Sequence, residues 1–374
     1  MIEHDTTLAG IARSLVASGK GILAVDESTA TCNKRFAKLG IAQTEEMRRS
    51  YRDLLLSAPG LAGFISGAIL YDETLRQSTA DGTPFVSVME SAGMLPGIKV
   101  DTGTVPLTGG SSEKITEGLD GLPARVAEYR RLGARFAKWR AVVTLGDGLP
   151  TQQCLEANAH ALARYARLCQ DGGLVPIVEP EVLMDGAHLL AECERVTEET
   201  LQRVFAALRL YGVALDAMIL KPSMVIAGTD AAAQADGDEV ARATVACLRR
   251  TVPAAVAGIA FLSGGQGDVR ATEHLDAMNR LPVAKPWPLT FSYGRALQEP
   301  ALEHWCGATD HVAEAQRRLV QRARCNAAAA CGAYTPAMET EAVIDATYRD
   351  AFEPPAEAAF ETPLFNERSL FRAV

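Results

Sequence analysis

Short apolar runs alternate with longer amphipathic stretches along most of the chain. The runs are rich in Val, Ile, Leu and Phe, as strands of a parallel sheet buried on both faces are. They occupy residues 21–26, 63–70, 96–101, 136–143, 174–181, 218–222, 258–262 and 289–292. The stretches that separate or follow them repeat hydrophobic positions every three to four residues, which predicts helices. These helices are expected at 7–18, 44–57, 84–91, 121–132, 151–171, 197–210, 237–250, 269–279 and 309–331.

Eight such strand–helix units predict an α/β fold, a single (β/α)₈ TIM barrel, whose active site lies at the carboxyl ends of the strands. We assign residues 1–331 to the barrel domain. Residues 332–374 are expected to form an irregular tail that packs over or near the active-site face. The Gly- and Thr-rich segment 102–118 is expected to be a long loop.

Composition narrows the functional classes. No apolar run reaches the roughly eighteen residues of a membrane span, and residues 1–10 lack the features of a signal peptide. The net charge of −9 without a basic run argues against nucleic acid as a partner. Eight cysteines without a C-x-x-C pair are typical of a reducing compartment. We therefore expect a cytoplasmic protein with neither a membrane nor a nucleic-acid partner.

The six histidines lack the spacing of a metal site, and none ends a predicted strand. We therefore expect no catalytic metal.

Charged residues instead stand at the ends of the predicted strands. Lys221 ends one apolar run and Glu179 another, and each is followed at once by a proline that stops the strand. Asp26 ends the first strand, while Lys138 and Arg140 are two apart and share one face of theirs. These groups should converge at the carboxyl rim of the barrel. A lone lysine here would more often be a solvent-seeking side chain, and a purely structural salt-bridge network is a further alternative.

Charges that converge in this way favour a reaction in which a lysine amine is the nucleophile. A partly desolvated lysine near other cations gives up its proton more readily and can attack a ketone. The protonated imine that results withdraws electrons, so a nearby carbon–carbon bond can break if a carboxylate moves protons. Glu179 and Asp26 suit that role.

Two groups of polar residues could hold anions. Ser263, Gly264, Gly265, Gly294 and Arg295 lie in loops after the last two strands, where barrels often bind phosphate. Ser28, Thr31, Lys34, Arg35 and Lys99 could hold a second anion on the opposite side. Taken singly, a Ser-Gly-Gly loop is more often a turn, and Lys34 with Arg35 more often a solvated helix face.

Several ordered motifs resemble the class I, Schiff-base-forming fructose-bisphosphate aldolases nearly from end to end. They are Gly-Lys-Gly-Ile-Leu-Ala (19–24), Asp-Glu-Ser (26–28), Gly-Ile-Lys-Val-Asp (97–101), Phe-Ala-Lys-Trp-Arg (136–140), Val-Pro-Ile-Val-Glu-Pro-Glu (175–181), Leu-Lys-Pro (220–222), Phe-Leu-Ser-Gly-Gly-Gln (261–266) and Thr-Phe-Ser-Tyr-Gly-Arg-Ala-Leu (290–297).

The resemblance implies reversible cleavage of fructose 1,6-bisphosphate into dihydroxyacetone phosphate and glyceraldehyde 3-phosphate, without a cofactor and in a homotetramer. It makes Lys221 the Schiff-base lysine, with Glu179 handling protons beside Glu181. Asp26 would act on the C4 hydroxyl and Lys138 would orient the substrate. For the C1 phosphate it implies Ser263, Gly264, Gly265, Ser292, Gly294 and Arg295. For the C6 phosphate it implies Ser28, Thr31 and Lys99, with Arg35 and Arg140 nearby.

One departure concerns the end of the chain. The animal enzymes that this chain resembles end in a tyrosine that folds over the site, whereas this chain ends in Arg372-Ala373-Val374. The substrate preference among sugar phosphates therefore stays open, and an aldolase favouring another sugar phosphate is an alternative. A barrel scaffold without activity is a further alternative, which the intact set of charged residues disfavours.

Overall fold

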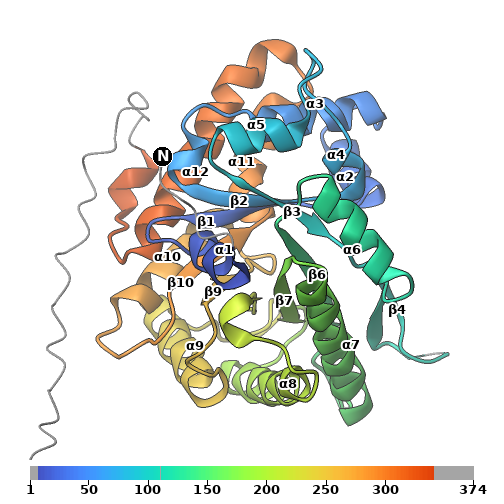
Figure 1. Ribbon diagram of the computed structural model, residues 1–374. Helices are drawn as coiled ribbons and strands as arrows, with labels where there is room; N and C mark the ends of the chain where they lie inside the picture. Colours follow the sequence, from blue (N-terminus) through green and yellow to red (C-terminus); the bar gives the residue numbers. More distant parts are fainter. Residues whose placement is uncertain (1–6, 110, 341–374) are drawn as a thin grey trace, which may run out of the picture. The chain divides into compact units, whose positions relative to one another are not determined.

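A closed barrel of eight parallel strands forms the centre of the computed structural model, which describes residues 7–109 and 111–340 (Figure 1). Around the barrel the strands follow the order β1-β10-β9-β8-β7-β6-β3-β2, so each barrel strand lies beside the next one along the chain and the pair β1–β10 closes the barrel. The strands are β1 (Gly21–Val25), β2 (Ile65–Leu70), β3 (Leu95–Lys99), β6 (Phe136–Val143), β7 (Val175–Val182), β8 (Ile219–Leu220), β9 (Gly258–Phe261) and β10 (Leu289–Tyr293). The predicted eight-stranded α/β barrel is confirmed.

Helices surround this barrel (Figure 1). The α-helices are α1 (Leu8–Leu15), α2 (Thr29–Lys38), α3 (Glu45–Leu56), α4 (Asp72–Leu75), α5 (Phe85–Ser91), α6 (Leu122–Arg131), α7 (Gln152–Asp171), α8 (Leu190–Leu210), α9 (Gly237–Thr251), α10 (Asp268–Arg280), α11 (Arg295–Trp305) and α12 (Val312–Ala330). Short 3₁₀ turns are η1 (Leu61–Gly63), η2 (Leu215–Ala217), η3 (Thr309–His311) and η4 (Pro336–Glu339).

Local side-chain caps determine where several helices begin. The hydroxyls of Thr7, Thr44 and Thr151 accept hydrogen bonds from backbone N–H groups of α1, α3 and α7. Asp236 and Glu239 form a reciprocal capping box at the start of α9. Each cap satisfies an N–H group that has no partner within its helix, which explains why the predicted starts at 7, 44, 151 and 237 lie close to the observed ones.

The interior of the barrel is apolar at one end. Ile22, Ala24, Phe136, Ile177 and Ile219 belong to one buried cluster, together with Ala12 and Leu15 of α1. The helix α1 therefore closes the barrel at the end where the strands begin (Figure 1). Alternate residues of a strand face the same way, so the next inward positions are those two residues further on.

Those next inward positions carry the predicted charges. Asp26 follows Ala24, Lys138 follows Phe136, Glu179 follows Ile177 and Lys221 follows Ile219, each by two residues. The same period of two that fills one end of the barrel with apolar side chains thus directs charged ones to the other end.

The outward-facing residues of the strands pack under the helices. Trp139 of β6 stacks on Tyr165 of α7, with ring centroids 5.5 Å apart. The Tyr165 hydroxyl lies 2.8 Å from the carbonyl oxygen of Ala137 and 3.1 Å from that of Ile177. This contact ties β6 to β7 beside the positions that carry Lys138 and Glu179, whose strands pair in register Arg140↔Glu179.

The segment 102–118, predicted to be a loop, differs from expectation. It contains a two-stranded antiparallel hairpin, β4 (Gly103–Pro106) and β5 (Lys114–Glu117). The Thr116 hydroxyl donates to the carbonyl of Arg140 at 2.7 Å. The buried Glu113 carboxylate accepts from the Thr151 N–H at 2.7 Å and from its hydroxyl at 2.6 Å. These contacts reach far along the chain, so local composition could not predict the hairpin.

Residues 332–340, the described part of the predicted tail, pack against α12 and α10. Arg322 pairs with Glu339, whose other oxygen accepts a 2.9 Å hydrogen bond from the Tyr334 hydroxyl. The Tyr334 N–H donates to Asp276 at 2.9 Å. The prediction that the tail packs over or near the active-site face concerns mainly residues 341–374, which lie outside the described residues.

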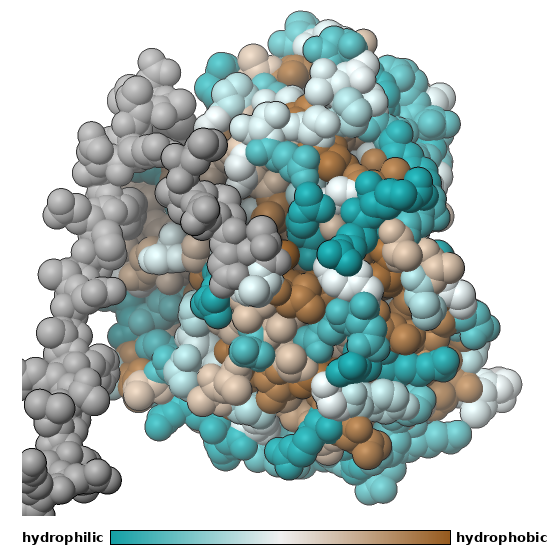
Figure 2. Space-filling view, in the orientation of Figure 1, coloured by the Kyte–Doolittle hydropathy of each residue, from teal (hydrophilic) through white to brown (hydrophobic). Residues whose placement is uncertain are grey.

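The described surface mixes polar and apolar side chains. Figure 2 shows hydrophilic residues interspersed with hydrophobic ones over the face that it presents. Large hydrophobic side chains that stay exposed include Leu210, at the end of α8, and Leu189, just before α8. Within residues 7–109 and 111–340, no helix combines the length and apolarity that crossing a membrane requires.

Candidate active site

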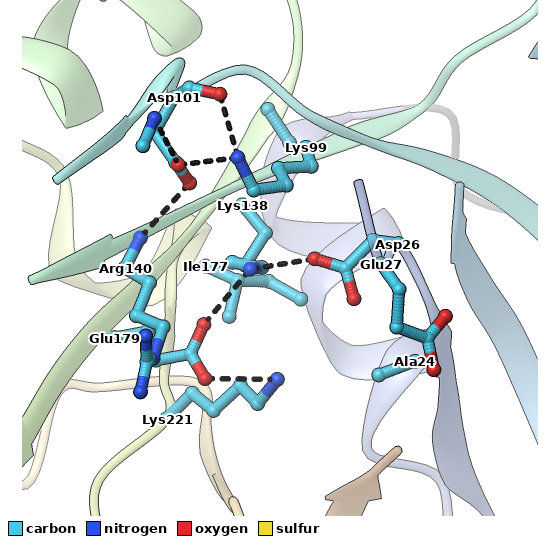
Figure 3. Close-up of polar contacts among 12 residues, drawn as sticks. Ala24, Asp26, Glu27, Lys99, Asp101, Lys138, Arg140, Ile177, Glu179 and Lys221 are labelled. Atoms are coloured by element: carbon cyan, nitrogen blue, oxygen red, sulfur yellow. Dashed lines mark hydrogen bonds and ion pairs between the residues drawn. The ribbon is translucent and has the colours of Figure 1, made fainter. Parts of the chain in front are cut away.

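Glu179 lies at the centre of a buried network of four charged side chains (Figure 3). Its Oε1 is 3.1 Å from Nζ of Lys221, and its Oε2 is 3.3 Å from Nζ of Lys138. Lys138 Nζ also lies 2.6 Å from Oδ2 of Asp26. One residue of the network comes from, or directly follows, each of the strands β1, β6, β7 and β8. The structure thus joins four of the five residues predicted to carry the chemistry, and Glu181 lies outside these contacts.

The network is electrically balanced, with two ammonium groups facing two carboxylates. Their side chains are between 4% and 13% exposed. Burial of an unpaired charge would cost several kcal/mol, so these four ions depend on one another. Removing any one of them leaves an uncompensated charge beside the others.

The balance shows in the pKa values. Burial by itself raises the pKa of Asp26, but the ammonium groups of Lys138 and Lys221 outweigh it and lower the value to about 2. Burial likewise raises the pKa of Glu179, but the charges of Lys138 and Lys221 outweigh it and lower the value. Burial lowers the pKa of Lys138, but Asp26 and Glu179 together raise it well above its usual range. In the free protein both carboxylates are therefore ionised at neutral pH and Lys138 is positive.

Asp101 forms a second centre that the sequence analysis left without a role. Its Oδ1 lies 2.5 Å from Nζ of Lys99, and its Oδ2 accepts from the N–H of Arg140 at 3.3 Å (Figure 3). The Asp101 side chain is 2% exposed. The signal was present in the sequence, because Asp101 follows Lys99 by two residues and could have been placed on the same side of the chain.

Glu181 pairs with a cation of its own. It forms a salt bridge with Nε of Arg140. Burial lowers the pKa of that arginine, but Glu181 outweighs burial and raises it. The side chain of Arg140 is 40% exposed, so its guanidinium faces the open end of the barrel. Glu181 was expected to assist Glu179, and within the described residues it pairs with Arg140.

The two Gly-rich loops lie side by side at the carboxyl ends of β9 and β10. A Cβ on Gly265 would lie 3.2 Å from Nη2 of Arg295, so the glycine lets the loop and the guanidinium approach each other. Ser263 is buried at the start of the first loop, and Arg295 is exposed at the start of α11. Gly264 and Gly294 complete the two turns.

Ser292 lies on β10, two residues before Gly294. Its side chain is buried, and its Oγ has no hydrogen-bond partner among the described residues. Buried hydroxyls without a partner are costly, so a polar ligand is a reasonable partner for this one. The loops therefore present a hydroxyl, backbone N–H groups and a guanidinium.

Residues of the loop after β1 form the other predicted anion site. Ser28 caps α2, and its hydroxyl lies 3.1 Å from that of Thr31. Arg35 is held by Glu27 at 2.5 Å and by the Gln298 amide oxygen at 3.0 Å. Arg35 is therefore tied to protein groups, and Glu27 and Gln298 are partners that the sequence analysis did not identify.

Titratable ligands do not gather into a metal site in this part of the molecule. Among residues 7–109 and 111–340, no group of three or more His, Cys, Asp and Glu side chains is arranged to hold a metal ion. The expectation of a reaction without metal or cofactor stays a prediction.

The fold and this site define the protein as a (β/α)₈-barrel enzyme with a lysine–carboxylate centre at the carboxyl ends of its strands. A family model described as "Glycolytic: Fructose-bisphosphate aldolase class-I" matches residues 7–353. The chain belongs to the class I fructose-bisphosphate aldolase family. It is a lyase that cleaves fructose 1,6-bisphosphate reversibly into two triose phosphates, and its substrates are sugar phosphates.

Relatives from distant organisms agree with this assignment. A probable fructose-bisphosphate aldolase class 1 of Xylella fastidiosa is 56% identical over 326 residues, which cover 87% of this chain and 97% of that protein. Fructose-bisphosphate aldolase 5, cytosolic, of Arabidopsis thaliana is 50% identical over 89% of this chain and 93% of that protein.

A solved structure shares the fold. Fructose-bisphosphate aldolase from Plasmodium falciparum, in a ternary complex with TRAP and a small-molecule inhibitor, has a TM-score of 0.86 and 49% identity, covering 88% of this chain and 95% of that chain.

Proposed function

We propose that Lys221 is the nucleophile that forms a Schiff base with the C2 ketone of fructose 1,6-bisphosphate. The observation that supports this most directly is the position of its Nζ, buried and 3.1 Å from Glu179 Oε1. Lys221 first passes its ammonium proton to Glu179, and attack by the resulting amine gives a carbinolamine, which must lose water to become the protonated imine. A carboxylate beside the amine can accept the proton released in the attack and return it to the departing hydroxyl. We assign that transfer to Glu179, with Glu181 beside it.

Asp26 is the proposed base for bond cleavage. It accepts the proton of the C4 hydroxyl while the C3–C4 bond breaks, and the electron pair moves into the protonated imine to give an enamine. A base must be ionised, and the pKa of about 2 keeps Asp26 a carboxylate. When the substrate hydroxyl competes for Lys138, the ion pair weakens and the pKa of Asp26 rises, which makes it a stronger base. Lys138 thereby orients the substrate.

The substrate's two phosphates are proposed to bind at opposite sides of this centre. Ser263, Gly264, Gly265, Ser292, Gly294 and Arg295 would hold the C1 phosphate. Ser28, Thr31 and Lys99, with Arg35 and Arg140 nearby, would hold the C6 phosphate. Arg35, Lys99 and Arg140 already have carboxylate partners, so a phosphate there shares each cation with Glu27, Asp101 or Glu181.

Borohydride trapping tests the Schiff base. Reduction in the presence of dihydroxyacetone phosphate should add to Lys221 the mass of one dihydroxyacetone phosphate less one oxygen atom, because imine formation expels water and the reduction adds two hydrogens. Lys221→Met should abolish the adduct, whereas Lys285→Met, a half-buried lysine that caps carbonyls near α10, should leave it intact. A label on Lys138 or Lys99 would overturn the assignment.

Activity measurements separate the alternatives. Wild-type protein that cleaves no sugar phosphate would identify an inactive scaffold, and faster cleavage of fructose 1-phosphate or a seven-carbon bisphosphate would redefine the substrate. Loss of activity in EDTA would replace the imine by a metal-stabilised enolate.

We further propose a cytosolic homotetramer in which residues 1–331 form the catalytic domain and 332–374 a tail near the active-site face. The word "cytosolic" in the name of the Arabidopsis relative supports the location, and the family resemblance supports the oligomer. Sedimentation equilibrium that gave the monomer mass would contradict the tetramer.

A further inference from the structure

Gln266 clamps the loop that follows β9. Its side-chain Nε2 donates to the carbonyl oxygen of Ser263 at 3.1 Å, and its backbone N–H donates to the same oxygen at 3.0 Å. One carbonyl thus receives two N–H groups of one residue. Gln266 is 8% exposed, so the clamp is shielded from water.

Between the two ends of this clamp the backbone turns sharply. Gly264 and Gly265 both have positive φ, at +62° and +100°, where side chains with a Cβ are strained. Two successive glycines are conformationally free, so they hold a turn in one conformation only when other residues contact it. The double bond to Ser263 supplies that constraint and determines where the N–H groups of the turn point.

His274 in turn determines how the Gln266 carboxamide is oriented. Its Nδ1 lies 2.6 Å from Oε1 of Gln266, and the imidazole is 3% exposed. An amide oxygen only accepts, so Nδ1 carries the proton of this bond. Burial lowers the pKa of His274 to about 4, so the ring is neutral at pH 7 and has one N–H to donate. With Oε1 bound to His274, the NH₂ group must face Ser263.

We propose that Gln266 is a positioning residue for phosphate binding, holding the Ser263–Gly265 turn so that it presents its N–H groups to the anion, and that His274 orients Gln266. The proposal rests on the assignment of this loop to the C1 phosphate. Neither side chain touches the reacting atoms in this scheme. Both act through the shape of the loop.

The test replaces Gln266 by methionine, which keeps the length of the side chain and removes its hydrogen bonds. Gln266→Met should raise the inhibition constant of inorganic phosphate and the concentration of dihydroxyacetone phosphate needed for half-maximal borohydride trapping, each about tenfold, the effect of losing a hydrogen bond of ordinary strength. Trapping with unphosphorylated dihydroxyacetone, which has no anion to place, should keep its wild-type rate.

Two further variants isolate the role of His274. His274→Leu removes the donor and should reproduce part of the loss for phosphate. His274→Asn places an amide nitrogen near the position of Nδ1, so it should restore phosphate binding towards the wild-type value. A purely structural histidine would not show this rescue together with an unchanged rate for dihydroxyacetone.

Gln170→Met is the matched control. The Gln170 amide donates to the carbonyls of Ala214 and Ala217 at 2.8 and 3.1 Å, in the segment that precedes β8 and hence at the other end of the barrel. It should not change the inhibition constant of phosphate. An equal loss with both trapping reagents in Gln266→Met, or an unmoved phosphate inhibition constant in both Gln266→Met and His274→Leu, would overturn the proposal.

Failure of the Schiff-base assignment would appear elsewhere. In that case wild-type protein would carry no label on Lys221. Failure of the Gln266 proposal alone leaves that label in place, and Gln266→Met then shows no loss that is specific to phosphate.

Discussion

Replacement of Asp26 by asparagine tests whether the buried ion network contributes stability through its charges. Asparagine has nearly the same shape as a protonated aspartate, so Asp26→Asn imitates the carboxyl group with its proton permanently attached. Lys138 then keeps the charge of Glu179 at 3.3 Å but loses the negative charge of its partner at 2.6 Å. The variant should therefore be less stable wherever the wild-type Asp26 is ionised.

The size of the effect follows from the pKa of Asp26, which falls from an ordinary value of 3.8 to about 2 in the folded protein. Because the folded value is the lower one, the stabilisation is present in full above about pH 5 and is lost as the pH falls towards 2. A difference of about 1.8 pKa units corresponds to about 2.5 kcal/mol at pH 7, and the same linkage leaves about 1.3 kcal/mol at pH 3.

Urea unfolding followed by tryptophan fluorescence at fixed protein concentration measures this difference. The gap in unfolding free energy between wild type and Asp26→Asn should shrink by about half between pH 7 and pH 3. A gap that is the same at both values would show that Asp26 contributes through shape rather than charge, and the ion-network argument would be wrong.

The same variant also tests the catalytic role. Cleavage should slow by about 10²–10⁴-fold, as expected when a general base is lost. Trapping of dihydroxyacetone phosphate on Lys221 should persist, because imine formation is assigned to Glu179. A variant that loses trapping and cleavage together would contradict the division of labour between the two carboxylates.

Two other substitutions probe the phosphate loops and the hairpin. Arg295→Ala should raise KM for fructose 1,6-bisphosphate roughly ten- to a hundredfold, since a charge-assisted hydrogen bond contributes about 1.5–3 kcal/mol, and Arg295→Lys should recover only part of it. An unchanged KM in steady-state assays would refute the role of Arg295. Glu113→Gln should lower the free energy of unfolding in urea by about 1–2 kcal/mol, because its two bonds to Thr151 lose their charge, while KM stays the same. A large KM effect would instead link the hairpin to substrate binding.

Much of the fold could be predicted from the sequence because its signals are local. Runs of β-branched residues, helical periodicity and capping threonines depend on neighbours within a few positions, and these identified the strands and most helices. The helix that begins at Arg295 was not predicted, and it contains Pro300, a residue that ordinarily interrupts a helical pattern. The motif resemblance extended the prediction to the reaction.

The alternation of inward and outward side chains along each strand also determined much of the site, although the site residues are far apart in the sequence. Once β1, β6, β7 and β8 are parallel strands of one barrel, Asp26, Lys138, Glu179 and Lys221 must face inward at the same end. The sequence alone was therefore sufficient to predict that these four charges meet.

The choice of partners was decided only by the tertiary structure. Glu181 pairs with Arg140, Lys99 with Asp101, and Arg35 with Glu27 and Gln298. His274 reaches Gln266 from the helix that follows the loop. Such contacts depend on side-chain rotamers and on the ångström-scale approach of elements that are distant in sequence, and periodicity contains no information about either. The pattern of residues thus determined which end of the barrel is charged, and the packing of the side chains determined which charged groups pair with each other.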